Sequence, residues 1–148
     1  MQLRIVGVLA VLVVAGLIAV GCAPTSTDDP AKVEAVVVEK IEGSDLERLT
    51  LSPKAAERLG VETAPVGASS VGAGLTAVPY AAIIYDKEGA TWTYTNPSGL
   101  AYVRHEVIVD HIAGDLAILT SGPDVGTFVV TIGAAELWGV ETGVGGGH

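Results

Sequence analysis

A lone cysteine has the most distinctive chemistry of any side chain in this sequence. Cys22 follows a short start whose only charge is Arg4, and then an apolar run over residues 5–20. A transmembrane helix needs about 20 apolar residues, so this shorter run is typical of an export signal. Because Cys22 is the only cysteine, an exported chain can form no internal disulfide. Its thiol is therefore available for another covalent modification.

The residues before Cys22 are small, and this ending resembles the lipobox of bacterial lipoproteins. The resemblance implies that a diacylglycerol is attached to the Cys22 thiol and that the chain is cut just before this residue. The alternative is an uncleaved signal anchor, but the short apolar run favours the lipid anchor. Either way, we expect the chain on the extracytoplasmic face of the cell membrane. The polar, proline-bearing residues 22–32 are expected to form a flexible tether.

Two histidines are the residues that most nearly suggest a metal site. His105 and His111 are separated by six positions, an even spacing that would place both on one face of a strand. On a strand they would lie roughly 20 Å apart, too far to share one ion. A soft Cu(I) site needs Met or Cys, and the sequence has neither beyond Met1 and Cys22. We therefore predict no metal site.

Cofactor and catalytic patterns are also incomplete. Residues 72–77 match the spacing of the dinucleotide fingerprint, but that motif needs a strand before it and a helix after it to hold a pyrophosphate. Val78 and Pro79 follow at once and oppose a helix. The sequence also has no Gly-x-Ser-x-Gly elbow and no metalloprotease helix motif. We expect neither a bound cofactor nor an enzyme.

Four aromatic side chains are candidates for either the hydrophobic core or a partner contact. They are Tyr80, Trp92, Tyr94 and Trp138. Aromatic residues often anchor interfaces, yet each also buries a large area and this small chain has few alternatives for its core. The core assignment is therefore favoured for these residues, and the interface assignment stays open.

The charge of the chain narrows its partners. Eight Lys and Arg residues face 17 Asp and Glu residues, which gives a net charge of −9. Such an acidic chain is not expected to bind nucleic acid or to adhere to anionic lipid through a basic patch. Membrane attachment is therefore expected to come from acyl chains.

The elements that must position these residues are predicted to be antiparallel strands with one or two short helices, which makes the fold mainly β. Ser52 as N-cap, Pro53 at the first helical position and Gly60 at the end predict a helix over residues 53–59. A single helical turn is expected over 133–138. The expected strands are residues 31–42, 46–51, 61–66, 81–85, 91–95, 100–110, 116–120 and 127–132.

One strand carries a prediction about its buried face. In the strand over 100–110, period-two alternation places Ala101, Val103, Val107 and Val109 on one face, together with His105, and we expect that face to be buried. Farther upstream, the small residues 67–74 are typical of a flexible connection and suggest a boundary near residue 70.

Several stretches resemble periplasmic adaptor subunits, the membrane fusion proteins of haemolysin-D type. Residues 78–86, the strand around Trp92, and residues 133–141 look like their C-terminal part, while residues 49–63 look like their opening. The resemblance divides the chain into an export signal (1–21), a tether (22–32), an adaptor-like opening (33–70), an adaptor-like membrane-proximal β domain in the form of a small barrel or meander (71–142), and a glycine-rich tail (143–148).

The resemblance implies a non-enzymatic accessory subunit of an efflux transporter in the inner membrane. The chain lacks the lipoyl-like halves and the helical hairpin that adaptors carry between these stretches, because Val66 and Val78 are separated by only 11 residues. The resemblance therefore reaches only the membrane-proximal part. The alternative is a free-standing lipoprotein module that binds a small ligand or an envelope component.

The lipid anchor gives the first testable prediction. A Cys22→Ser variant should lose incorporation of a fatty-acid analogue, because serine offers no thiol for the acyl group. Metabolic labelling followed by gel fluorescence measures this incorporation. Equal labelling of the wild type and the variant would contradict the anchor.

Overall fold

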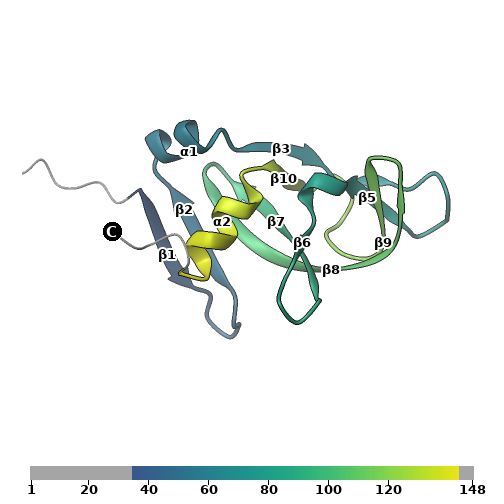
Figure 1. Ribbon diagram of the computed structural model, residues 1–148, viewed down its shortest axis with the longest axis horizontal. Helices are drawn as coiled ribbons and strands as arrows, with labels where there is room; N and C mark the ends of the chain where they lie inside the picture. The colour runs from purple at the N-terminus through teal and green to yellow at the C-terminus, as the bar shows by residue number, and fades with distance from the viewer. Residues whose placement is uncertain (1–34, 144–148) are drawn as a thin grey trace, which may run out of the picture. The chain divides into compact units, whose positions relative to one another are not determined.

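The computed structural model describes residues 35–143, which belong to one compact unit that begins at Val33. The expected export signal, Cys22 and the tether lie outside the described residues, as does the tail from residue 144. Figure 1 shows the elements. In chain order they are β1 (Val36–Lys40), β2 (Glu47–Leu51), α1 (Pro53–Leu59), β3 (Glu62–Pro65), β4 (Gly67–Ala68), β5 (Thr76–Pro79), the 3₁₀ turn η1 (Tyr80–Ala82), β6 (Ile84–Tyr85), β7 (Thr91–Ser98), β8 (Ala101–Ala113), β9 (Leu116–Ser121), β10 (Phe128–Ile132) and α2 (Ala134–Glu141).

The strands form one antiparallel sheet that is nearly closed into a barrel, so the predicted mainly β fold with short helices is confirmed. Its strands follow the order β3-β10-β7-β8-β9-β5-β4, with β2 joined to β8, β1 joined to β2, and β6 joined to β7. Strands β3 and β4 lie at opposite ends of this order, yet only Val66 separates them in the chain. Their connection therefore brings the two ends of the sheet together.

Helix α1 is confirmed, and so are the signals that predicted it. The Ser52 hydroxyl accepts a hydrogen bond from the Ala55 N–H at 3.2 Å, and Pro53 occupies the start of the helix. Gly60 ends it in a left-handed conformation with φ 61°, which glycine adopts without steric cost. Ala55, Ala56 and Leu59 turn the inner face of the helix against the hydrophobic core. The helix thereby covers the neighbouring strand β2.

Two hydrophobic clusters fill the molecule. The first consists of Leu49, Leu51, Tyr94, Tyr102, Val130, Ala134 and Leu137. The second consists of Val66, Val78, Ala82, Val107, Ala117, Leu119 and Val129. Strand β8 contributes to both, because Tyr102 and Val107 are an odd number of positions apart and so lie on opposite faces of the strand. The middle of the sheet is therefore covered on both sides.

This double coverage corrects the predicted buried face of the strand over 100–110. On that face Val107 is buried and Val103 is half-buried, but His105 is exposed, while Tyr102 is buried on the opposite face. A period-two pattern identifies a buried face only where the other face meets water. Here the first cluster covers the face that the pattern assigned to solvent.

Two further local predictions are wrong in detail. The small residues expected to form a flexible connection include a hairpin, in which Gly67 pairs with Ala77 and Ala68 with Thr76. Residues 80–82, which include the start of the strand expected over 81–85, form a 3₁₀ turn instead, with only Ile84 and Tyr85 in strand conformation.

The suggested boundary near residue 70 falls inside the compact unit. Strand β2 pairs with β8, and β3 pairs with β10. The chain before residue 70 and the chain after it therefore share one sheet.

Candidate functional site

Three of the four predicted aromatic residues are near one arginine. The guanidinium carbon of Arg104, on β8, lies 4.2 Å from the ring centroid of Trp92 and 4.9 Å from that of Trp138. Both distances are within the range of cation–π attraction. Trp92 comes from β7 and Trp138 from α2, so the arginine links the sheet to the C-terminal helix.

A carboxylate completes this cluster. Glu141, the last residue of α2, places Oε1 3.2 Å from the Arg104 Nε, and the two side chains are only 6% and 17% exposed. The Arg104 Nε has no well-aligned hydrogen bond, so the contact is chiefly electrostatic. The Tyr94 hydroxyl donates to the other carboxylate oxygen of Glu141. Together, Tyr94 and Arg104 compensate a charge whose burial would otherwise be costly.

Tyr94 is the most deeply buried member of this arginine–aromatic cluster. Its side chain is 0% exposed. Burial raises the pKa of its phenol well above the ordinary value, and the hydrogen bond and negative charge of Glu141 raise it further. The phenol is therefore held in its protonated, donating form, and Tyr94 belongs to the core.

The turn before β7 positions Trp92. The Trp92 Nε1–H donates to Asp86 Oδ2 at 2.9 Å, and Asp86 Oδ1 accepts from the backbone N–H groups of Glu88 and Ala90 at 3.0 and 2.8 Å. The hydrogen bond from Trp92 is the main reason that the pKa of Asp86 is lowered. A carboxylate thus fixes both the turn and the edge of the indole ring.

A cavity of about 430 Å³ adjoins the cluster. Its lining residues are Asp86, Lys87, Glu88, Arg104, Trp138 and Thr142. One indole wall and side chains of both charges give it the features of a shallow site for a small polar ligand. Lys87 and Glu88 pair with each other at 3.4 Å on its exposed rim.

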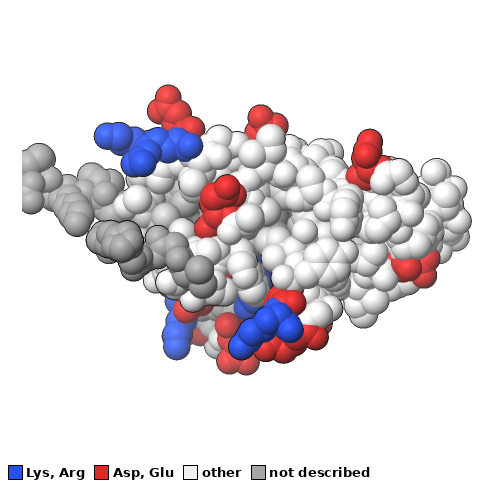
Figure 2. All heavy atoms as spheres, viewed as in Figure 1, with Lys and Arg blue, Asp and Glu red and all other residues white. Residues whose placement is uncertain are grey.

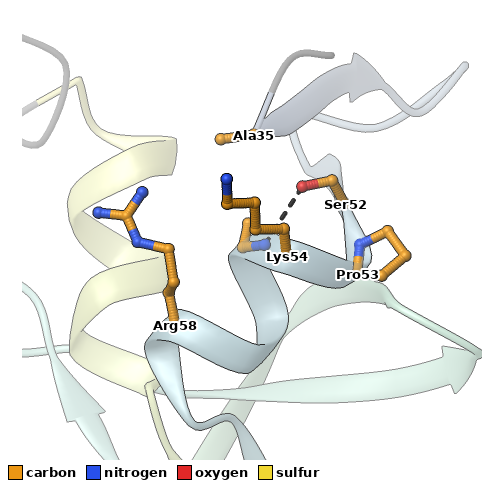
Figure 3. A pocket seen from close by; sticks show the side chains of 6 residues that line it. Ala35, Ser52, Pro53, Lys54 and Arg58 are labelled. Atoms are coloured by element: carbon orange, nitrogen blue, oxygen red, sulfur yellow. Dashed lines mark hydrogen bonds between the residues drawn. The ribbon is translucent and has the colours of Figure 1, made fainter.

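A second cavity lies beside α1 and is basic. Its volume is about 460 Å³, and it is lined by Ala35, Ser52, Lys54 and Arg58, among others. Figure 3 shows Lys54 and Arg58 extending from the helix in the same direction. Neither side chain belongs to an ion pair within residues 35–143. This pair is a local basic feature of an acidic protein.

The remaining candidate residues lie apart. Tyr80 is 44% exposed and lies beside Tyr85, whose pKa is raised first by their hydrogen bond. His105 is exposed, and the Nδ1 of His111 lies 2.7 Å from the Asp110 carboxylate. Within the part of the chain that the structure describes, no group of three or more His, Cys, Asp or Glu side chains could hold a metal ion.

No sequence pattern pointed to Arg104, Glu141 or Asp86 as residues of this site. Arg104 pairs with Tyr94 across the β7–β8 hairpin, but the register shifts between Thr95 and Ser98. Because of this shift, counting equal numbers of residues back from the turn does not place Arg104 opposite Tyr94. The contact with Glu141 joins residues 37 positions apart in the sequence, and no local pattern announces it.

Comparison with protein-family models, with curated proteins and with solved structures gave no match. Among the described residues, no helix is long and apolar enough to cross a membrane. The function must therefore be inferred from the residues and contacts described above.

The raised pKa of Tyr94 predicts how stability depends on pH. Because the folded protein binds the phenol proton more tightly than the unfolded chain does, the free energy of unfolding should fall as the pH rises above the ordinary tyrosine pKa of about 10. Tyr94 alone would contribute a slope of up to about 1.4 kcal/mol per pH unit. Chemical denaturation between pH 8 and about 11 measures this slope.

A Tyr94→Phe variant is the matched test of that prediction. It should lose about 1–2 kcal/mol at neutral pH, since the hydrogen bond to Glu141 is gone, and its stability should fall less steeply at alkaline pH. Tyr102, whose pKa burial raises, and Tyr85, whose pKa its hydrogen bond with Tyr80 raises, leave a residual slope. Identical slopes in both proteins would mean that Tyr94 does not hold its proton in the folded state.

Proposed function

We propose that this chain is a lipid-anchored, non-enzymatic accessory subunit in transmembrane transport, similar to the membrane-proximal part of an efflux-pump adaptor. One observation carries the proposal. The stretch that resembles the adaptor opening, residues 49–63, packs in the structure against residues 133–141, the last of the stretches that resemble the adaptor C-terminal part. A shortened adaptor must join these stretches directly, because the domains between them are missing.

The first hydrophobic cluster makes this junction. Leu49 and Leu51 come from the opening stretch, and Ala134 and Leu137 come from the C-terminal stretch; all four are buried. The approach is close at Gly133, where an added Cβ would lie 3.0 Å from the Val61 side chain. The opening and closing stretches thus share one core without the middle of an adaptor.

The surface supports an interaction role. Figure 2 shows a broad uncharged area on the viewed face, with acidic and basic side chains dispersed around it. Exposed large apolar side chains occur along the meander from β5 to β10 and include Tyr80, Ile108, Ile112, Leu116 and Phe128, which are 43–57% exposed. A contiguous exposed apolar patch often marks a protein contact, and these side chains are apolar surface that the meander offers to a partner. We therefore assign the transporter contact to the meander.

The cavity beside Arg104 favours a second candidate function. A free-standing lipoprotein module could bind a small ligand there or an envelope component, with Trp138 as the apolar wall and Arg104 and Lys87 as donors. In this alternative the chain would need no transporter. The two candidates differ in what contacts the meander.

Photocrosslinking from intact membranes separates the two candidates. Crosslinkers placed at Glu88 and Asp124, which are exposed positions on the meander, should each trap the same membrane protein. A crosslinker at Glu57, an exposed acid on α1, is the matched control and should trap several-fold less of it. Mass spectrometry identifies the trapped species.

A different crosslinking result would contradict the transport proposal. If the meander positions trap no membrane protein, and a small ligand or an envelope polymer is recovered with the purified chain, the binding-module alternative replaces it. Asp28, in the tether expected from the sequence, offers a further control, since a crosslinker there should trap neighbours without specificity.

A further inference from the structure

Strand β1 has an open edge. Within residues 35–143 it pairs with β2 alone, and Figure 1 shows it at the outer margin of the sheet. Val37 and Val38 are 42% and 43% exposed. An edge strand of this kind is a template for another strand unless proline, a bulge or central charges protect it. Val36–Lys40 contains no proline, pairs with β2 without a register shift, and has valine at its centre.

The hydrogen bonds at the two ends of the β1–β2 ladder show which backbone groups face outward. The Ile41 N–H donates to the Leu46 carbonyl at 3.1 Å, and the Ser52 N–H donates to the Ala35 carbonyl at 2.9 Å. Both bonds involve the odd-numbered residues that directly flank β1. Because successive residues of an antiparallel strand direct their polar groups to opposite sides, the even-numbered residues Val36, Val38 and Lys40 direct theirs to the open edge.

This alternation limits how a second copy of β1 could pair antiparallel to the first. Three registers bring the outward groups together and also pair at least three residues of each β1 strand, and they are centred on Val37, Val38 or Glu39. The register centred on Glu39 opposes two carboxylates, which is unfavourable. The register centred on Val38 sets Val37 against Glu39. Only the register centred on Val37 sets valine against valine throughout, with Val36 opposite Val38 and Val37 opposite itself.

Charged residues on either side of Val37 also favour the pairing of β1 with a second copy of itself. In the sequence, Glu34 and Lys40 stand three positions on either side of it. A register centred on Val37 therefore matches Lys40, the last residue of β1, with the sequence position of a glutamate in the second copy. Opposite charges directly across antiparallel strands stabilise pairing. An unrelated strand has no reason to match this pattern, whereas a second copy matches it by symmetry.

We propose that β1 pairs with β1 of a second copy of this chain in the antiparallel register centred on Val37. The dimer joins two sheets through backbone hydrogen bonds from Val36 and Val38. A strand of five residues buries far less surface than the roughly 1,200 Å² of a stable interface. The pairing is therefore weak and depends on concentration. It stands independently of the proposed transport function, because it involves none of the meander positions.

Disulfide trapping tests the register. In this register Val37 and its counterpart form a non-hydrogen-bonded pair with Cα atoms about 4.5 Å apart, within the range that a disulfide spans. A Val37→Cys variant of the full chain should give several-fold more covalent dimer on mild oxidation than a Val38→Cys variant. The wild type controls for Cys22, and Val125→Cys, at an exposed loop position, controls for random collision.

A second variant tests the pairing without a new thiol. Val38→Pro removes an N–H that points to the open edge and leaves the β1–β2 ladder its own hydrogen bonds. Sedimentation of the wild type should show a concentration-dependent dimer, and the variant should lose it while its circular dichroism spectrum is unchanged. A wild type that stays monomeric at every concentration overturns the proposal. Trapping at Val38 instead of Val37, or capture of a different protein on this edge, also overturns it.

Discussion

The connection through Val66 is the constraint on which the rest of the fold depends. Strand β3 is the first strand in the order of the sheet and β4 is the last, and Val66 is the single residue between them in the chain. The Val66 N–H donates to the Thr127 carbonyl and its carbonyl accepts from the Gly126 N–H, both at 2.8 Å. Its side chain is 1% exposed, within the second cluster. The sheet must therefore curl until its ends nearly meet, which encloses that cluster.

A curled sheet still has an outer face to cover, and the first cluster covers it. Helices α1 and α2 and the strand β2 pack there, and Arg104 and Glu141 fasten the end of α2 to the sheet. The arginine–aromatic cluster therefore has a structural role: it holds α2 against the sheet. Arg104 and Glu141 compensate each other's charge, and the rings of Trp92 and Trp138 lie against the guanidinium. The cavity at its margin is the place where a ligand would meet both elements. The structural role of the cluster and the alternative function therefore involve the same residues.

The sequence predicted those parts of the fold that local rules determine. Ser52, Pro53 and Gly60 predicted α1, and the alternating residues predicted the strands over 91–95 and 116–120, which lie within β7 and β9. Local rules failed where the second face of a strand is buried by distant residues, as at Tyr102. They also failed where small residues pair as strands, as at Gly67 and Ala68. Neither side-chain periodicity nor propensity carries that information, since both features depend on the closure of the sheet.

The same limit applies to the candidate site. The sequence selected Trp92, Tyr94 and Trp138 by residue type, but not the charged side chains that they surround, because Arg104 and Glu141 meet only after α2 has packed on the sheet. The anchor at Cys22 depends on the sequence alone. The packing of the opening and closing stretches in one core carries the proposed function, and the export signal expected from the sequence accounts only for the proposed anchor.

The central claim is that the opening and closing stretches belong to one core. Native-state hydrogen exchange of the full chain measures this most directly. Amides in β2 and β3, from the opening stretch, should share one large opening free energy with amides in β7, β8 and β10, because a single cooperative unit opens as a whole. Low concentrations of denaturant should lower the opening free energies of both groups of amides in parallel. If β2 and β3 instead exchange through a separate opening of lower free energy while the later strands stay protected, the opening stretch is not part of one unit with the C-terminal region.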